Sequence, residues 1–244
     1  MITAEDKQSF LEQGYLHVPG VLTGDTLERY RNDFDRVWET EKPPVGSRKL
    51  LKHPSFLELI EHPAILNVHR SFFGKALQLI QYDLLRQGPQ SSSADRAWHR
   101  DFTHPGDLPL SINTIVYFDD MDEEVGPTRV VPGTHKGDAL PPPEHHHDPL
   151  PGEVPVYARA GDVVFINSAI WHTGGRNAGG GLRRGAYLYY GYWWLRPFSD
   201  TEPEKYAVPW EALQGATPQR LELLGLKMPI SDIHMYQPEE ASGV

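Results

Sequence analysis

The stretch RAWHRDFTH, residues 96–104, places His99 and Asp101 two positions apart behind an aromatic residue. In an extended segment the side chains at i and i+2 point the same way, so this imidazole and this carboxylate can bind one ion. A non-haem iron site that activates dioxygen uses two imidazoles and one carboxylate on one face of the metal. The triplet alone is weak evidence, because a chain with 12 histidines contains about one His-x-Asp by chance.

A third ligand is available at His172, in SAIWHTGG, directly after the apolar run DVVFIN. A rival His-x-Asp triplet at residues 146–148 lies in a proline-rich loop with no apolar strand leading into it. Only one or two strands fit between that triplet and His172. The segment from Asp101 to His172 is long enough for several strands, so the chain can run around a barrel and bring His172 back beside His99 and Asp101. We therefore favour His99, Asp101 and His172 as ligands, and interpret the rival as a solvated loop in which incidental metal binding stays open.

An arginine pair follows His172 by eleven residues, at the start of the aromatic run RRGAYLYYGYWW. Strand alternation sends Arg183 and Arg184 to opposite faces, so at most one of them points into a barrel. A guanidinium held in a pocket suits bidentate capture of a carboxylate. The alternative is that both arginines are surface residues at the end of a strand and have no role in binding.

The elements that must position these residues are helices first and strands afterwards. Helical spacing predicts a capped helix over 3–13, a long amphipathic helix from Thr23 to about Glu41, and shorter helices around 54–61 and 63–73. After Gly74, β-branched and aromatic runs are separated by Gly, Pro, Asp and Asn. The pattern predicts a mainly β protein with flanking helices (α+β), built as a sandwich or jelly roll with helices packed on one sheet.

The chain shows no internal repeat and no linker that would divide it. We expect one domain over residues 1–244, with a helical N-terminal part (1–74), a β core (about 75–196) and a C-terminal extension (197–244) of short helices and a polar tail. The segment DALPPPEHHHDPLPGEVP is expected to be a long loop.

Composition narrows the classes of function. The absence of cysteine excludes disulfides and thiolate metal sites, and makes a cytoplasmic location the default. A formal charge of −10 argues against nucleic acid and against a polyanionic substrate such as a coenzyme A thioester. No apolar run is long enough to span a membrane, and MITAEDKQSF does not suggest export.

Several motifs together carry a resemblance to a known family. AWHRDF, GPTRVVPGTHKG, AGDVVFINSAIWHTGGRN and LRRGAY, in this order, resemble the phytanoyl-CoA dioxygenase family of iron(II)- and 2-oxoglutarate-dependent oxygenases. The N-terminal FLEQGYLHVPGVLTGDTLERYRNDFDRVWE is similar to the family's opening. The similarity covers about residues 5 to 196, and ordered motifs are far more specific than one triplet.

The resemblance implies a double-stranded β-helix, the jelly roll of cupin-like proteins, that uses iron(II), 2-oxoglutarate and dioxygen. It implies that Arg183 binds the distal carboxylate of 2-oxoglutarate, and that the side chain of Arg184 points out of the barrel. Relatives often carry a lysine where this chain has LLRQGP, which leaves open which residue adds positive charge on that side. The implied site comprises the iron ligands and catalytic residues His99, Asp101 and His172, with Arg183, Gln81 and Asn113 as contacts to 2-oxoglutarate.

The implied reaction is hydroxylation of an unactivated C–H of a small molecule, with release of succinate and carbon dioxide. Halogenating relatives lack the carboxylate ligand, so Asp101 favours hydroxylation. Two alternatives remain: a cupin-like metal enzyme of another reaction type, and a catalytically idle relative used for binding.

Overall fold

The N-terminal part of the chain is helical in the computed structural model, which describes residues 2–89, 97–143 and 148–227. Thr3 and Asp6 form a reciprocal capping box at the start of the first helix, and Gly14 ends that helix in the left-handed conformation. These local signals explain why the helix begins and ends where the sequence predicts. The helices of this part are α1 (Ala4–Gln13), α2 (Gly24–Glu41), α3 (Ser47–Leu50), α4 (Pro54–Ile60) and α5 (Pro63–Phe73).

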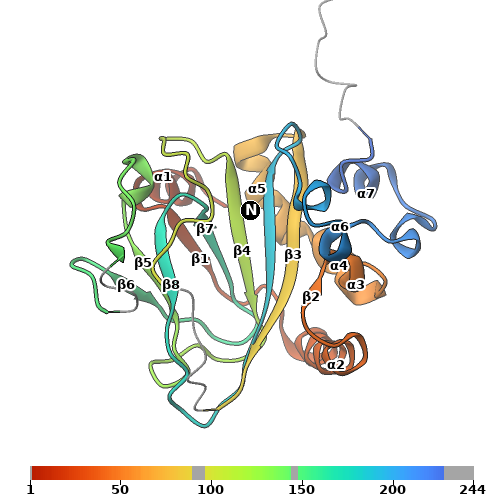
Figure 1. The fold of residues 1–244 in the computed structure, drawn as a ribbon, viewed down its shortest axis with the longest axis horizontal. Coiled ribbons are helices and arrows are strands. Elements are labelled where there is room, and N and C mark those ends of the chain that lie inside the picture. Colours follow the sequence, from red (N-terminus) through yellow and green to blue (C-terminus); the bar gives the residue numbers. More distant parts are fainter. Residues whose placement is uncertain (1, 90–96, 144–147, 228–244) are drawn as a thin grey trace, which may run out of the picture.

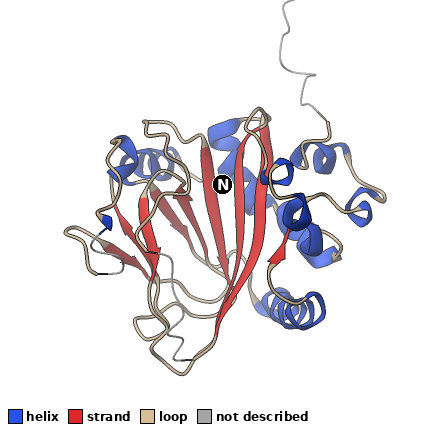
Figure 2. Cartoon of the chain, in the orientation of Figure 1, coloured by secondary structure: helices blue, strands red, loops and turns tan. Residues whose placement is uncertain are grey.

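Two antiparallel sheets form the body of the protein (Figures 1 and 2). The strands are β1 (Tyr15–Val18), β2 (Val45–Gly46), β3 (Leu77–Gln87), β4 (Ser111–Tyr117), β5 (Thr128–Val131), β6 (Val154–Val156), β7 (Val163–Asn167), β8 (Trp171–Gly174) and β9 (Arg183–Tyr192). The larger sheet has the order β1-β7-β4-β9-β3-β2 and the smaller one β6-β5-β8. Between β4 and β9 the chain passes repeatedly from one sheet to the other, and the predicted double-stranded β-helix is confirmed.

The larger sheet is buried on both faces. On β4, Ile112 and Val116 belong to the core shared with the helices, whereas Ile115 and Tyr117 belong to the core between the two sheets. Figure 1 shows the helices α2, α4 and α5 on the side of this sheet away from β5 and β8. The strict alternation of β4 therefore separates a structural face from an inner face that can carry a site.

The C-terminal extension packs short helices beside the edge of the larger sheet. They are the 3-10 turn η3 (Phe198–Asp200), α6 (Pro203–Tyr206), the 3-10 turn η4 (Trp210–Leu213) and α7 (Pro218–Leu223). The polar tail expected after them lies largely outside the described residues. None of the helices in the described ranges combines the length and apolar character that a membrane crossing demands.

Asp162 holds the start of β7 to the end of β1, and its removal should destabilise the fold. Its carboxylate accepts hydrogen bonds from the backbone amides of Gly20 and Arg159, each at 2.8 Å, and lies 2.8 Å from His17 Nε2. We expect Asp162→Ala to lower the free energy of unfolding by about 2–4 kcal/mol, because two amides lose a charged acceptor. Urea unfolding measures the change, with the exposed Asp107→Ala as the control.

The pH dependence of this effect has a definite sign. Burial opposes ionisation of Asp162, but the hydrogen bonds from Gly20 and Arg159 outweigh it and lower its pKa below the usual 3.8. A lowered pKa in the folded state stabilises the fold above the unfolded pKa, and the stabilisation disappears as the pH falls through the folded pKa. The gap between the wild type and Asp162→Ala should therefore be full at neutral pH and narrow below about pH 4. A gap that is constant from neutral pH to that range would contradict this assignment.

Candidate metal centre

His99 and His172 are brought together by a pair of backbone hydrogen bonds. The amide of His99 donates to the carbonyl of His172 and the reverse bond is also made, each at 3.0 Å. Residues that exchange both bonds lie directly opposite one another, with their side chains on the same face. The two imidazole centroids are consequently 4.2 Å apart.

Asp101 completes the cluster from the same segment as His99. Its amide and that of Phe102 donate to the carbonyl of Ser168, at 2.8 and 2.9 Å, which anchors the segment beside the turn into β8. The Asp101 carboxylate lies 3.6 Å from the Nε2 atom of each imidazole. The three ligand atoms all lie within 4.8 Å of one another, close enough for one ion to join them.

The orientation of each imidazole is fixed by its other nitrogen. Nδ1 of His99 lies 2.8 Å from the carbonyl oxygen of Ala97, and Nδ1 of His172 lies 3.0 Å from that of Ile170. A carbonyl only accepts, so Nδ1 carries the proton in both rings and donates it. Nε2 is then left with its lone pair directed at the cluster, which is the arrangement of histidine ligands in metal sites.

The Asp101 carboxylate is buried but held in its ionised form. Asn113 Nδ2 donates to it at 3.2 Å and the Tyr189 hydroxyl at 3.3 Å. Burial raises the pKa of Asp101, but when no metal is bound, protonated His172 and His99, together with the Asn113 amide, outweigh it and lower the pKa below 3.8. The site therefore offers one anionic oxygen and two imidazole nitrogens, a donor set that fits iron(II).

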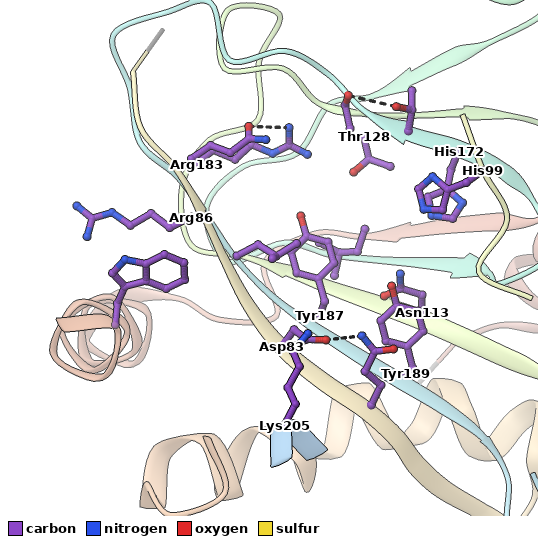
Figure 3. A pocket seen from close by; sticks show the side chains of 17 residues that line it. Asp83, Arg86, His99, Asn113, Thr128, His172, Arg183, Tyr187, Tyr189 and Lys205 are labelled. Carbon is purple, nitrogen blue, oxygen red and sulfur yellow. Dashed lines mark hydrogen bonds and ion pairs between the residues drawn. The ribbon is translucent and has the colours of Figure 1, made fainter. Parts of the chain in front are cut away.

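The cluster opens into a cavity of about 460 Å³ between the two sheets (Figure 3). One wall of the cavity is formed by β3, β9 and β4 of the larger sheet. Residues at paired positions on these strands lie side by side and form rows across the wall. Gln81, Tyr189 and Asn113 form the row nearest Asp101, and Asp83, Tyr187 and Ile115 form the next.

Arg183 lies at the far end of β9 from Tyr189, opposite Gln87 of β3. Its side chain is buried and lines the cavity, and its Nη1 donates to the carbonyl of Gly175 at 2.7 Å and to the Gln87 amide oxygen at 3.4 Å. Arg184 points to the opposite face, where Asp119 and Asp35 pair with it. Strand alternation thus separates the two arginines as the sequence predicts.

The remaining predicted site residues also line the cavity, with contacts that the sequence did not reveal. Gln81 donates to Asp83, and Asn113 donates to Asp101. In the described part of the chain Asn113 Oδ1 is buried without a partner, and it would need a donor. Because 2-oxoglutarate presents only acceptor oxygens, a contact with Asn113 would have to use Nδ2. The roles of Gln81 and Asn113 toward 2-oxoglutarate stay predictions.

One placement differs from the sequence expectation, and another falls partly outside the described residues. His172, expected directly after the strand DVVFIN, lies within a further short strand, β8, because a turn at 168–170 separates β8 from β7. In the rival triplet, Asp148 is exposed and residues 146 and 147 are not described.

Sequence reasoning missed the polar residues of the second row. Asp83 lines the cavity together with Lys205, which comes from α6 in the C-terminal extension. The alternation of Gln81 and Asp83 in the apolar strand LQLIQYDLLRQ was an available signal that one face of β3 is polar. Lys205 had no comparable signal, since its position depends on how α6 packs.

Comparison with known proteins agrees with this geometry. HygX from Streptomyces hygroscopicus, solved with nickel and 2-oxoglutarate bound, matches the fold with a TM-score of 0.69 over 80% of this chain and 89% of its own, at 22% identity. Another HygX structure also contains hygromycin B. The jelly roll and the cluster of two histidines and one aspartate are those of a non-haem iron oxygenase.

The family follows from the sequence comparisons. The model of the phytanoyl-CoA dioxygenase family matches residues 10–185. The peroxisomal phytanoyl-CoA dioxygenase of Mus musculus is 23% identical over 233 residues, which cover 78% of this chain and 69% of the mouse protein. The Mycobacterium tuberculosis protein Rv1501 is 27% identical over 186 residues, 68% of this chain and 67% of its own. The chain belongs to the phytanoyl-CoA dioxygenase family, and is thus an oxygenase that uses iron(II), 2-oxoglutarate and dioxygen.

Proposed function

We propose that this protein hydroxylates an unactivated C–H bond of a small molecule and converts 2-oxoglutarate to succinate and carbon dioxide. The observation that carries the proposal is the cavity itself. It has His99, Asp101 and His172 clustered at one end and the Arg183 guanidinium at the other. We treat residues 1–244 as one catalytic domain, because both the β core and the C-terminal extension contribute to this cavity.

In the proposed site, His99, Asp101 and His172 hold the iron through Nε2, a carboxylate oxygen and Nε2. The bound metal, with 2-oxoglutarate and dioxygen, supplies the oxidising chemistry. Asn113 and Tyr189 hold the Asp101 carboxylate in place, and the two backbone carbonyls fix the imidazole rings. The protein thereby orients its ligands before the metal arrives. The presence of the Asp101 carboxylate favours hydroxylation over halogenation, since halogenating relatives lack this ligand.

The separation between the cluster and Arg183 suits a five-carbon diacid. Arg183 donates to the carbonyl of Gly175, which follows His172 by three residues. Three residues of extended chain span roughly 10 Å, so Arg183 is held about that far along the chain from His172. We propose that Arg183 pairs with the distal carboxylate of 2-oxoglutarate while the other end binds the metal. Gln81 and Asn113 are proposed as further polar contacts on the larger sheet.

A small organic substrate fits the remaining space. The volume of about 460 Å³ lies in the range of small-molecule sites and must hold 2-oxoglutarate as well. The similar protein HygX has been solved with a small molecule, hygromycin B. The formal charge of −10 favours a substrate without coenzyme A, and the absence of cysteine favours the cytoplasm.

Metal removal tests this proposal. We expect protein treated with a chelator and dialysed to form no succinate from 2-oxoglutarate, and added iron(II) to restore the activity. Zinc(II) should bind the same residues without restoring it, because it has no redox chemistry. Succinate is measured by mass spectrometry under air, and a metabolite extract incubated with isotope-labelled dioxygen should yield a product that carries one labelled oxygen atom.

The two readouts separate the parts of the proposal. Succinate formation that survives chelation, or that zinc supports, would contradict an iron site. Succinate formation with products that lack labelled oxygen would retain the iron site but exclude hydroxylation.

A further inference from the structure

The wall of the cavity nearest the C-terminal extension carries an ion pair that the iron site does not require. Lys205 Nζ of α6 lies 2.9 Å from the Asp83 carboxylate of β3, and both side chains line the cavity. Figure 3 shows Lys205 rising toward Asp83, with Tyr187 between that pair and Arg183. The matched family region ends at residue 185, so the lysine lies beyond it.

The sequence makes specific room for Lys205 to reach the cavity. Gly46 of β2 pairs with Asp83, and a Cβ atom at Gly46 would lie 2.6 Å from Lys205 Cγ and 2.8 Å from its carbonyl oxygen. Such distances are too short for any other residue without movement of α6. The absence of a side chain at position 46 therefore allows the lysine stem to cross β2 and approach Asp83.

Asp83 is already well supplied with donors. It is buried, and it accepts from the Gln81 amide, from the Tyr206 hydroxyl at 3.2 and 3.3 Å, and from Lys205. The pKa of Lys205 is raised, because its contacts with Tyr206 and Asp83 outweigh burial. Lys205 is therefore protonated at neutral pH, and the Asp83 carboxylate, with these donors already around it, has little capacity left for another molecule.

Lys205 keeps donor capacity toward the cavity. Its side chain is 31% exposed, and an ammonium has three N–H groups, of which one can point to Asp83 while the ammonium lies 4.7 Å from the centre of the Tyr206 ring. Asp83 already neutralises its charge, so a substrate carboxylate would gain little from it, while an uncharged oxygen can accept a remaining N–H. The apolar surfaces of Tyr187, Ile115 and Leu85 line the same cavity and suit a carbon framework.

We propose that Lys205, held by Asp83 and Gly46, is a specificity-determining residue that donates a hydrogen bond to a carbonyl or hydroxyl oxygen of an uncharged substrate. The inference rests on the proposed function, since it assigns the substrate side of the same cavity. Under this proposal, a residue of the C-terminal extension selects the substrate, whereas the residues that hold the iron belong to the β core.

A matched set of bicyclic probes tests the proposal: α-tetralone, tetralin and tetralin carboxylate share one framework and differ in the polar group. Dissociation constants are measured by ligand-observed NMR on protein loaded with zinc(II) and 2-oxoglutarate. We expect the wild type to bind α-tetralone about five- to tenfold more tightly than tetralin, the value of one hydrogen bond. Lys205→Met should remove the preference, and Lys205→Arg should keep most of it.

Two further variants separate recognition from folding. Lys227→Met, at an exposed lysine of the same extension, should bind all three probes as the wild type does. Gly46→Ala should lose the preference for α-tetralone while Lys205 itself is unchanged, because the added methyl displaces α6. Thermal unfolding shows whether each variant remains folded.

The remaining outcomes decide against the proposal. An unchanged preference in Lys205→Met, tightest binding of the carboxylate probe, or no binding of any probe by the wild type would each overturn it. The visible charge-transfer absorption of the anaerobic complex with iron(II) and 2-oxoglutarate checks the proposed function separately. If the wild type lacks that absorption, the proposed function fails; if Lys205→Met retains it, the loss of probe preference concerns the substrate side alone.

Discussion

Asp101→Ala should lower the rate of conversion of 2-oxoglutarate to succinate by more than about a hundredfold. Mutation of a residue that only hydrogen-bonds to a metal ligand already lowers metal affinity or activity by about 10- to 100-fold, and loss of the ligand itself should cost more. Asp101 supplies the one anionic oxygen of the cluster and lies 3.6 Å from both imidazole Nε2 atoms. Without it, the two neutral histidines alone bind iron(II) weakly. Iron content by elemental analysis and succinate formation at saturating iron are the measurements.

Asp148→Ala is the matched control for this experiment. Asp148 ends the rival His-x-Asp triplet, and it is exposed. This variant should retain the wild-type iron content and turnover, and thermal unfolding should show that both variants remain folded. Full activity in Asp101→Ala, or its loss in Asp148→Ala, would mean that the proposed cluster is not the iron site.

Much of the fold was predictable because its signals are local. The capping box of Thr3 and Asp6 defines the start of α1 within a few residues of chain. The apolar runs that become β4 and β7 carry enough β-branched residues to be identified as strands without knowledge of their partners. The short strand β8 was not separated from β7, since four residues after a turn give too little periodicity.

The proposed iron ligands were predictable in type but not in arrangement. A histidine and a carboxylate two residues apart suggested a shared ion, and the apolar run before SAIWHTGG suggested His172 as the third ligand, in agreement with the family resemblance. The convergence itself depends on the bonds between His99 and His172, which join segments that are far apart in the sequence. No local pattern encodes such a pair, because contacts across a sheet are set by register.

The ion pair of Asp83 and Lys205 shows where sequence reasoning ends. Tyr206, the neighbour of Lys205, is 123 residues from Asp83 in the chain, and α6 has only four residues. The position of α6 depends on how this helix packs against β2, where Gly46 leaves room for Lys205. A lysine in a short C-terminal helix is usually a solvated residue, and only the tertiary structure distinguishes this one.

Arg183→Ala should raise the KM for 2-oxoglutarate by about 30-fold or more, because removing one partner of a buried charge pair costs about 2–5 kcal/mol. The side chain is buried at the end of the cavity away from His99 and His172, and its Nη1 donates to Gly175 and Gln87. Turnover at saturating 2-oxoglutarate should fall much less than KM rises, since Arg183 lies at the end of the cavity away from His99 and His172. Initial rates of succinate formation over a range of 2-oxoglutarate concentrations give both constants.

Two other arginine positions make this prediction specific. Arg183→Lys should recover only part of the affinity, because an ammonium is a point charge and cannot bind a carboxylate through two parallel hydrogen bonds. Arg176→Ala removes an exposed arginine near the same strand and should leave KM unchanged. If Arg183→Ala lowered turnover without changing KM, the residue would act on the structure of the cavity rather than on the cosubstrate. A rise in KM with retained iron binding, by contrast, requires that the distal carboxylate reach this end of the cavity.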